Sequence, residues 1–446
     1  MIMCTRHKPE ETIQAHFNEA VQWRRDLHKC PQPSWVEFFA TGYVAEKLEE
    51  WGYELKLGRE IIAEDKQLLL PEATILQREY ERALKAGVQE KYISPAQGGF
   101  TGVVGILKGD QPGPTVAFRF DIDSNEGLES KAGSHRPVKE GFASQNPGYA
   151  HMCGHDAHTA MGLLLACHFA ENKANLKGTI KFLFQPNEEN LSGAAAMIAT
   201  GQLDDVDYLF SGHVGVSARK IGQIALDIHS ILALSRFEVS YTGRPTHAGI
   251  SPNEGKNALL GACAAVTNLY AIARHDQGAS RINVGTLEAG TTWNIIPESA
   301  NFRLETRGVS NEVNSYMVQK ATEVLQGAAQ MYDLTLEVKP AATALSGRNS
   351  PELIKLGQKV AENLHSVQET IPKIPFNGSE DVTLMMERVQ NQGGKALFVL
   401  FGTPVFGGHH NSTFDVDENV IFNGAEFLAR IHEAVTEESL IDDYRQ

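Results

Sequence analysis

The chain has 446 residues, enough for two domains of ordinary size with substantial hydrophobic cores. Its 40 basic and 55 acidic residues give a net charge of −15, which argues against nucleic acid or an anionic membrane as the main partner. The polar N-terminus predicts no signal peptide, and the five scattered cysteines indicate a reducing compartment, so we expect a cytoplasmic protein without a membrane span.

The first part of the chain reads as helical. Apolar residues recur at helical spacing over 12–29 and 35–51. The segment 58–97 is charged and helix-favouring at its centre, and Pro71 marks a start for a helix there. This segment therefore predicts a helical insertion on an α/β scaffold.

From residue 100 onward, short apolar strands alternate with helices. FTGVVGIL, TVAFRFD, GTIKFLFQP and VDYLFSGHV are near-continuous apolar runs, and a helix is expected at about 158–173. Such alternation predicts a mostly parallel sheet that is covered by helices on both faces.

The order of elements changes near residue 230. A strand at RFEVSYTG, a helix at 254–275, two strands, a helix at 311–332 and the strand LTLEVKP form a β-α-β-β-α-β unit of the ferredoxin-like type. Predicted helices at 351–364, 379–390 and 417–438 follow, together with the apolar strand ALFVLFG. We therefore predict a catalytic domain at 1–229 and 346–446, interrupted by a smaller α+β domain at 230–345.

Four polar motifs lie at or just beyond the ends of predicted strands, where open α/β sheets place their sites. They are HMCGHDAH (151–158), FQPNEEN (184–190), FSGHVG (210–215) and FGTPVFGGHHNSTFDVDE (401–418). In an extended segment, Cys153 and His155 would point to the same face. The candidate side chains are Cys153 and His155, the carboxylates Glu188 and Glu189, His213, and the pair His409 and His410.

Each motif alone has an ordinary alternative, such as a surface carboxylate pair or a structural histidine. Together, thiolate, imidazole and carboxylate groups from separate strand ends would supply about five ligands, which suits two divalent metals better than one tetrahedral structural site. In the smaller domain, GRPTHAG places His247 in a glycine-flanked loop, and WNIIP and FRLETR offer Asn294, Arg303 and Arg307. An arginine fork suits a substrate carboxylate, although an ordinary ion pair within the strands is an equal alternative.

These motifs resemble a known family. RRDLH (24–28), DID (121–123), HMCGHDAH, FQPNEE, GRPTHAG, NIIP and GSED (378–381) are similar to motifs of the di-metal amidohydrolases and exopeptidases that include aminoacylases, carboxypeptidase G and plant auxin-conjugate hydrolases. The likeness covers essentially the whole chain, and the Cys-Gly-His-Asp form is typical of the auxin-conjugate branch. The insertion at 58–97 sets this chain apart from ordinary members of that branch.

The resemblance implies an activity, cofactors and a partner. It implies hydrolysis of the amide bond of an N-acyl amino acid, with p-aminobenzoyl-glutamate as the leading substrate and other N-acyl amino acids or dipeptides as alternatives. A further alternative is a non-catalytic partner of a related enzyme. Two Mn²⁺ or Zn²⁺ ions per chain would be the cofactors. The inserted domain would be a dimerisation domain, in a homodimer or in a heterodimer with a related chain.

The resemblance also implies a role for each site residue. Glu188 would be the general base, and Asp123 would orient a metal ligand. His247 would reach into the site of the partner chain and help to stabilise the oxyanion, while Asn294 and Arg307 would bind the substrate. The implied metal ligands are Cys153 as a bridging thiolate, His155, Glu189, His213 and His410.

Several neighbouring positions also bear on the expected site. His410 is preferred over His409 because its spacing to Phe414 fits the family's terminal motif. Asp156 and His158 are expected to orient the ligands or to pack. Asn187 stands where family members commonly have alanine, which suggests an altered side-chain specificity.

Overall fold

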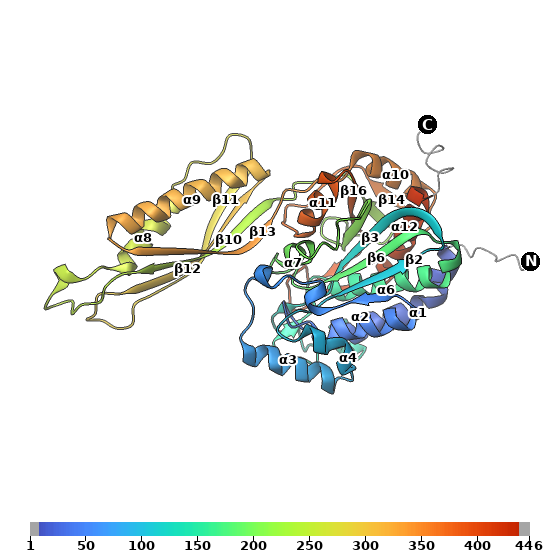
Figure 1. The fold of residues 1–446 in the computed structure, drawn as a ribbon, viewed down its shortest axis with the longest axis horizontal. Coiled ribbons are helices and arrows are strands. Elements are labelled where there is room, and N and C mark those ends of the chain that lie inside the picture. Colours follow the sequence, from blue (N-terminus) through green and yellow to red (C-terminus); the bar gives the residue numbers. More distant parts are fainter. Residues whose placement is uncertain (1–8, 437–446) are drawn as a thin grey trace, which may run out of the picture. The chain divides into compact units, whose positions relative to one another are not determined.

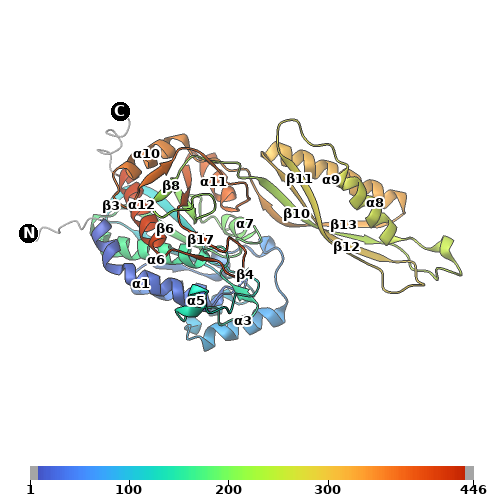
Figure 2. The ribbon, with the colours of Figure 1, turned by 180° about the vertical axis from the view of Figure 1, so that it is seen from behind.

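The chain folds into two units (Figures 1 and 2), and the computed structural model describes residues 9–436. The first unit comprises the chain up to His229, Arg348–Phe376 and the chain from Asp381 onward. The second comprises Ser230–Gly347 and the short segment Asn377–Glu380. The boundaries predicted from the sequence lie after residues 229 and 345, with all of 377–380 in the first domain.

The first unit is built on an eight-stranded sheet with the strand order β1-β2-β6-β3-β7-β16-β8-β14. Its four central strands are parallel: β6 (Lys177–Gln185), β3 (Gln111–Asp121), β7 (Tyr208–Val214) and β16 (Lys395–Phe401). The outer strands are β1 (Glu54–Lys56), β2 (Val103–Lys108), β8 (Gln223–Ala225) and β14 (Glu369–Ile371). β2 runs antiparallel to β6, and β8 runs antiparallel to β16. The predicted α/β class with a mostly parallel sheet is confirmed.

Helices cover both faces of this sheet (Figure 1). One face carries α6 (His155–Glu171), α12 (Asn419–Thr436) and α2 (Phe38–Glu50), with α1 (Pro9–Lys29) packed outside α6 and α12. The other face carries α7 (Gly193–Ile198) and α11 (Val382–Asn391). α10 (Pro351–Glu362) lies beside α12 of the first group of helices. This alternation of faces is what right-handed crossovers between parallel strands produce.

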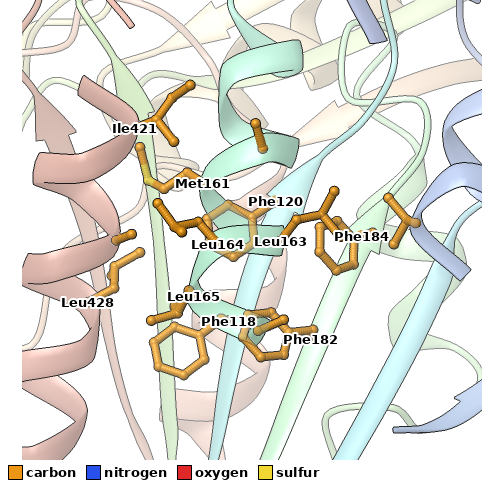
Figure 3. Close-up of a cluster of buried hydrophobic side chains, with 14 of the residues drawn as sticks. Phe118, Phe120, Met161, Leu163, Leu164, Leu165, Phe182, Phe184, Ile421 and Leu428 are labelled. Carbon is orange, nitrogen blue, oxygen red and sulfur yellow. The ribbon is translucent and has the colours of Figure 1, made fainter. Parts of the chain in front are cut away.

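The core between α6 and the sheet is aromatic (Figure 3). Phe118 and Phe120 on β3 and Phe182 on β6 are buried, and the rings of Phe118 and Phe182 stack with their centroids 5.5 Å apart. Gly162 lets α6 approach closely, because a Cβ atom there would lie 2.6 Å from the ring of Phe120. The helix that begins at His155 is thus firmly packed against the sheet.

The second unit is a four-stranded antiparallel sheet with the order β11-β12-β10-β13. Helices α8 and α9 pack on one of its faces, from which Phe302 and Leu304 contribute to the core. In chain order its elements are β10 (Ala233–Thr242), α8 (Ala258–Tyr270), β11 (Ser280–Ala289), β12 (Ser299–Gly308), α9 (Asn311–Met331) and β13 (Thr335–Ala344). The predicted ferredoxin-like unit is confirmed.

The segment 58–97 contains α3 (Ala73–Lys85) and α4 (Glu90–Ile93). Pro71 lies two residues before the start of α3 rather than in its first turn, because Glu72 has an extended ψ of 148°. Three short 3₁₀ turns complete the segment: Gly58–Glu60, Glu64–Lys66 and Ser94–Ala96. Among residues 9–436, no helix has the length and apolar character needed to cross a membrane.

The smaller elements connect this framework. They are α5 (Arg136–Lys139), the 3₁₀ turns Lys173–Asn175 and Pro252–Glu254, and the paired strands β4 (Asn125–Glu126) with β5 (Tyr149–Ala150), β9 (Ile228–His229) with β15 (Ile374–Pro375), and β17 (Val405–Phe406) with β18 (Asp415–Val416). The expected helix at 417–438 is α12, and residues 437 and 438 lie outside the described residues.

Candidate metal centre and active site

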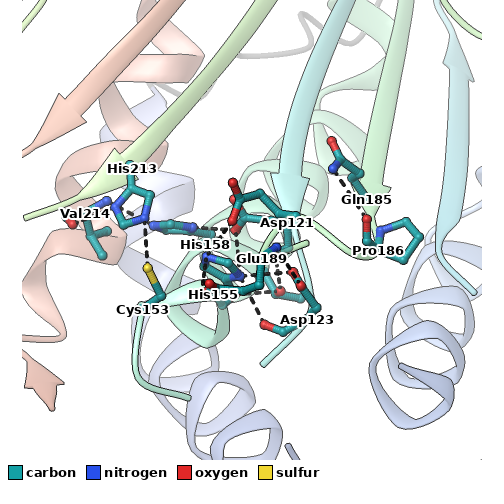
Figure 4. A network of polar contacts seen from close by, with 12 residues as sticks. Asp121, Asp123, Cys153, His155, His158, Gln185, Pro186, Glu189, His213 and Val214 are labelled. Carbon is teal, nitrogen blue, oxygen red and sulfur yellow. Dashed lines mark hydrogen bonds and ion pairs between the residues drawn. The ribbon is translucent and has the colours of Figure 1, made fainter. Parts of the chain in front are cut away.

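The candidate ligands gather at one edge of the central sheet (Figure 4), where the parallel strands β3, β6, β7 and β16 end. Asp123 follows β3, Glu188 and Glu189 follow β6, and His213 is the penultimate residue of β7. The loop after β16 carries the pair 409–410. Because parallel strands end at the same edge, residues far apart in the sequence meet here.

Cys153 and His155 meet by a different geometry from the one expected. His155 is the first residue of α6, so the segment is not extended, and α6 begins three residues before the expected start. Gly154 has a φ of +99°, and a Cβ atom there would lie 2.6 Å from Val214 Cγ2. The sharp turn at this glycine brings donor atoms of Cys153, His155 and Glu189 within 4.8 Å of one another.

Hydrogen bonds fix which ring nitrogens are available as ligands. Nδ1–H of His155 donates to the backbone oxygen of Asp123 at 3.1 Å, and Nδ1–H of His213 donates to the backbone oxygen of Val214 at 2.9 Å. In the neutral rings the Nε2 atoms therefore carry the lone pairs. Nε2 of His213 lies 3.4 Å from the sulfur of Cys153.

Two buried polar atoms at the centre have no hydrogen-bond partner. They are Nε2 of His155 and Oε1 of Glu189, and they lie 3.8 Å apart. Buried polar atoms are rarely left unpaired, so this pair indicates a ligand between them. Sulfur, imidazole and carboxylate donors are those that bind divalent metals such as zinc, and the donor set fits a metal.

The electrostatics of the centre favour positive charge at His155 and His410, whereas burial and the neighbouring cationic groups lower the pKa values of His213 and His409. Burial alone would lower the pKa of His155, yet Asp121, Asp123 and Cys153 raise it well above its usual value. The sulfur of Cys153 and the carboxylate of Glu189 raise the pKa of His410 to about 10. Burial disfavours a charged Glu189, but His410 and His155 lower the pKa of its carboxyl group to about 2.

The adjacent histidines of the last motif have different environments. Nε2 of His409 accepts a hydrogen bond from the backbone N–H of Val216 at 3.1 Å, so in the neutral ring Nδ1 carries the proton. That Nδ1 lies 3.7 Å from the sulfur of Cys153 and has no lone pair for a metal. Nε2 of His410 lies 3.4 Å from Glu189 Oε2, whereas donor atoms of His409, Cys153 and His213 lie within 4.8 Å of one another.

His158 and Asp156 take supporting positions on α6. Both ring nitrogens of His158 are used, since Nε2 accepts from the N–H of Val214 at 3.0 Å and Nδ1–H donates to Asp121 at 2.6 Å. Asp156 accepts hydrogen bonds from the buried Arg24 at 2.9 Å and from His28 at 2.8 Å. These contacts hold the start of α6 against β3 and α1.

Glu188 and Asp123 are placed beside the donor atoms. Glu188 is buried, and its Oε2 lies 3.8 Å from Nε2 of His155. Asp123 contacts His155 through Oδ1 at 3.2 Å and accepts the backbone N–H of Glu189 through Oδ2 at 3.0 Å. The amide nitrogen of Asn187 donates to Ser192 Oγ at 2.5 Å within its own loop, and its buried Oδ1 has no hydrogen-bond partner.

The remaining sequence-predicted residues belong to the second unit. The loops that carry His247 and Asn294 lie side by side, because the N–H of Ala248 donates to the backbone oxygen of Asn294 at 2.9 Å. Nε of Arg307 donates to Glu305 at 2.8 Å, and Nε of Arg303 donates to Glu238 at 3.2 Å. Both arginines therefore have the in-sheet carboxylate partners that the alternative interpretation anticipated.

The structure places two more residues at the centre: Asp121, for which the sequence suggested no role, and His409, a candidate that was set aside in favour of His410. Asp121 binds His158 and accepts a hydrogen bond from Arg119 at 2.9 Å. His409 contacts Cys153, although it was passed over as a ligand. The spacing of the DID motif, with its alternate residues on one side of a strand end, was the one available signal for Asp121.

Known proteins are similar to this chain in sequence and in fold. A family profile described as Peptidase family M20/M25/M40 matches residues 117–434. The chain is 43% identical over 420 residues to indole-3-acetyl-aspartic acid hydrolase of Enterobacter agglomerans, covering 94% of this chain and 96% of that one. It is 43% identical over 409 residues to a p-aminobenzoyl-glutamate hydrolase subunit of Escherichia coli strain K12, covering 92% and 94%.

A solved structure agrees with these likenesses. The aminobenzoyl-glutamate utilization protein from Klebsiella pneumoniae superimposes with a TM-score of 0.82 at 36% identity, covering 95% of this chain and 98% of that one. The similarity extends over both units of the fold.

Proposed function

The chain belongs to peptidase family M20/M25/M40, and from that membership and the geometry of its centre we propose that it hydrolyses p-aminobenzoyl-glutamate to p-aminobenzoate and glutamate. It is a metal-dependent hydrolase of amide bonds. The observation that carries the proposal is the meeting of the unpaired His155 Nε2 and the unpaired Glu189 Oε1 beside the carboxylate of Glu188.

The choice of substrate rests on two likenesses. The Escherichia coli relative is named for p-aminobenzoyl-glutamate, and the Klebsiella pneumoniae protein is named for aminobenzoyl-glutamate utilization.

A second candidate substrate is indole-3-acetyl-aspartate. The Enterobacter agglomerans relative is named for it and is equally similar to this chain, at 43% identity. Both substrates join an aromatic acyl group to a dicarboxylic amino acid. We therefore propose this class of conjugate as the substrate class, ahead of other N-acyl amino acids.

The ligands we propose form two metal positions that share Cys153. His155 and His213 would complete one position, and Glu189 and His410 the other, with Mn²⁺ or Zn²⁺ as the ion. When bound, such ions acidify a water molecule and polarise the amide carbonyl. Cys153, with its sulfur 3.4 Å from His213 and in contact with His410, lies between the two sets.

The chain's own residues would move the proton and hold the substrate. Glu188 would take a proton from the attacking water and deliver it to the leaving amine. Asp123 would keep the Nδ1–H of His155 engaged, which turns Nε2 toward the ion. His247 would stabilise the oxyanion in the site of a partner chain, and Asn294 and Arg307 would bind the substrate. Arg307 or Arg303 would take the substrate carboxylate in place of its in-sheet glutamate partner.

The assembly we propose is a dimer through the second unit, in the cytoplasm. The Escherichia coli relative is named as one subunit of its enzyme, which supports a heterodimer with a related chain as well as a homodimer. Native mass measurement of the chain alone, and after co-expression with a related second chain, separates these two assemblies.

The activity is tested by incubating the purified, metal-loaded protein with p-aminobenzoyl-glutamate, indole-3-acetyl-aspartate and N-benzoylglycine. We expect p-aminobenzoate release to have the highest kcat/KM. Glu188→Ala should lower kcat by roughly 10²–10⁴-fold with unchanged metal content, whereas Glu387→Ala, at an exposed glutamate on α11, should not. Absence of release, even with a co-expressed second chain, would contradict the proposal, and turnover of indole-3-acetyl-aspartate alone would establish the second candidate.

A further inference from the structure

The loop Pro186–Ser192, which carries Glu188, is irregular and tightly wound. Asn187 and Leu191 both have left-handed backbones, with φ of +55° and +57°. The N–H of Leu191 donates to the backbone oxygen of Glu188 at 2.6 Å, and the N–H of Gly193 donates to that of Asn187 at 3.2 Å. Such a conformation persists only where the surroundings hold it.

Two buried carboxylates hold the backbone on either side of Glu188. Oδ2 of Asp123 accepts the N–H of Glu189 at 3.0 Å. Oε1 of Glu37 accepts the N–H of Asn187 at 2.8 Å. We infer that Glu37 is a positioning residue for Glu188: it anchors the loop on the side that Asp123 does not reach, and so fixes the direction in which the Glu188 carboxyl group points.

Glu37 has the properties of an anchor rather than of a reacting group. It is fully buried, and Oε2 accepts the hydroxyl of Thr101 at 2.5 Å. Burial and the neighbouring Asp123 raise the pKa of its carboxyl group to about 8. A proton on Oε2 would donate to Thr101 and leave Oε1 free to accept from Asn187, so the anchor works in either protonation state.

The insertion at 58–97 holds the segment from which Glu37 projects. Trp35 is fully buried with a φ of +64°, and its Nε1–H donates to the backbone oxygen of Leu68 at 2.7 Å. Nε2–H of Gln32 donates to the backbone oxygen of Glu79 at 2.9 Å. The insertion thus braces the segment 32–37, and through Glu37 it acts on the loop that carries the base.

This inference rests on the proposed role of Glu188, so its test includes a readout that needs no substrate. Glutamine at position 37 can accept from Asn187 through Oε1 and donate to Thr101 through Nε2, whereas alanine can do neither. In Glu37→Ala, hydrogen exchange at peptides covering 184–193 should become faster, while Glu37→Gln should keep the protection of the wild type. Thr101→Val is the matched control, because it removes the other hydrogen bond of Glu37 and leaves the one to Asn187.

Kinetics with the metal-loaded enzyme give the second readout. Glu37→Ala should lower kcat about 10²-fold, as small displacements of catalytic groups do, with KM within about threefold and metal content unchanged. Glu37→Gln and Thr101→Val should both stay within about fivefold of the wild-type kcat. If Glu37→Ala does not fold, Glu37→Leu, which keeps most of the side-chain volume, replaces it.

Three results would overturn the inference. The first is unchanged exchange at 184–193 in the alanine or leucine variant. The second is a Glu37→Gln variant as impaired as Glu37→Ala, which would show that the acceptor for Asn187 is not what matters. The third is a loss of metal that accounts for the loss of kcat. If the wild type turned over no substrate, the proposed function would fail, and the exchange data would still decide the role of Glu37 as an anchor.

Discussion

His28 is a buried imidazolium held between two carboxylates, and we predict that it makes the stability of the first unit depend on pH. Its side chain is fully buried, with Nδ1 2.8 Å from Asp156 and Nε2 2.9 Å from Glu129. Burial alone would lower its pKa, but the hydrogen bonds to Asp156 and Glu129 raise the pKa to about 9. The perturbation is His28→Gln, which removes the charge and keeps a side chain that can form hydrogen bonds.

The sign and size of the effect follow from proton linkage. A group whose pKa is raised by folding stabilises the folded state fully below its unfolded pKa, and this stability is lost as the pH rises through its folded pKa. With pKa values of about 6.5 unfolded and about 9 folded, protonated His28 contributes about 3 kcal/mol at pH 6 and less than about 1 kcal/mol at pH 9. The stability difference between wild type and His28→Gln should therefore shrink by about 3 kcal/mol over this range.

Urea unfolding followed by tryptophan fluorescence measures this difference. Trp23 and Trp35 are buried in the first unit, whereas Trp293 in the second unit is fully exposed, so the signal reports mainly on the unit that contains His28. His365→Gln, at an exposed histidine, is the control, and its difference from wild type should stay constant. A constant difference for His28→Gln as well, or one that grows with pH, would refute the reasoning.

Other predictions follow from single contacts. Arg24 is buried among Asp156, Asp415 and Glu418, so replacing it by methionine should lower the free energy of unfolding by about 3–5 kcal/mol. Replacing the half-exposed Arg388 by methionine should lower it by less than about 1 kcal/mol in the same urea assay. His410→Ala should lower the metal bound per chain, measured by plasma emission, whereas His409→Ala should leave the content unchanged; equal loss in both would contradict the tautomer assigned to His409. Phe118→Ala should lower the unfolding free energy by about 3–5 kcal/mol, and a loss below about 1 kcal/mol would show that the aromatic core rearranges.

The framework could be predicted from the sequence because it depends on local patterns. Continuous apolar strands alternating with helices indicate a parallel sheet, and a parallel sheet brings its strand ends together, so Glu189, His213 and His410 could be expected near one another. The turn at Gly154, with its φ of +99°, could not, since the side chain of Val214 that leaves no room for a Cβ atom there is far along the chain. Glu37 gave no signal either, because its partner Asn187 lies 150 residues further along the chain.

Neighbouring residues at the centre have different functions, because their side chains point in different directions. Oε1 of Glu189 lies near Nε2 of His155, while the backbone N–H of Glu189 donates to Asp123. His410 contacts Glu189, whereas His409 accepts a hydrogen bond from the backbone N–H of Val216. In α6, His155 faces the centre and Asp156 binds Arg24. Adjacent side chains point in different directions, so at 155–156 and at 409–410 one member of the pair faces the centre while the other fastens the same stretch of backbone to the scaffold.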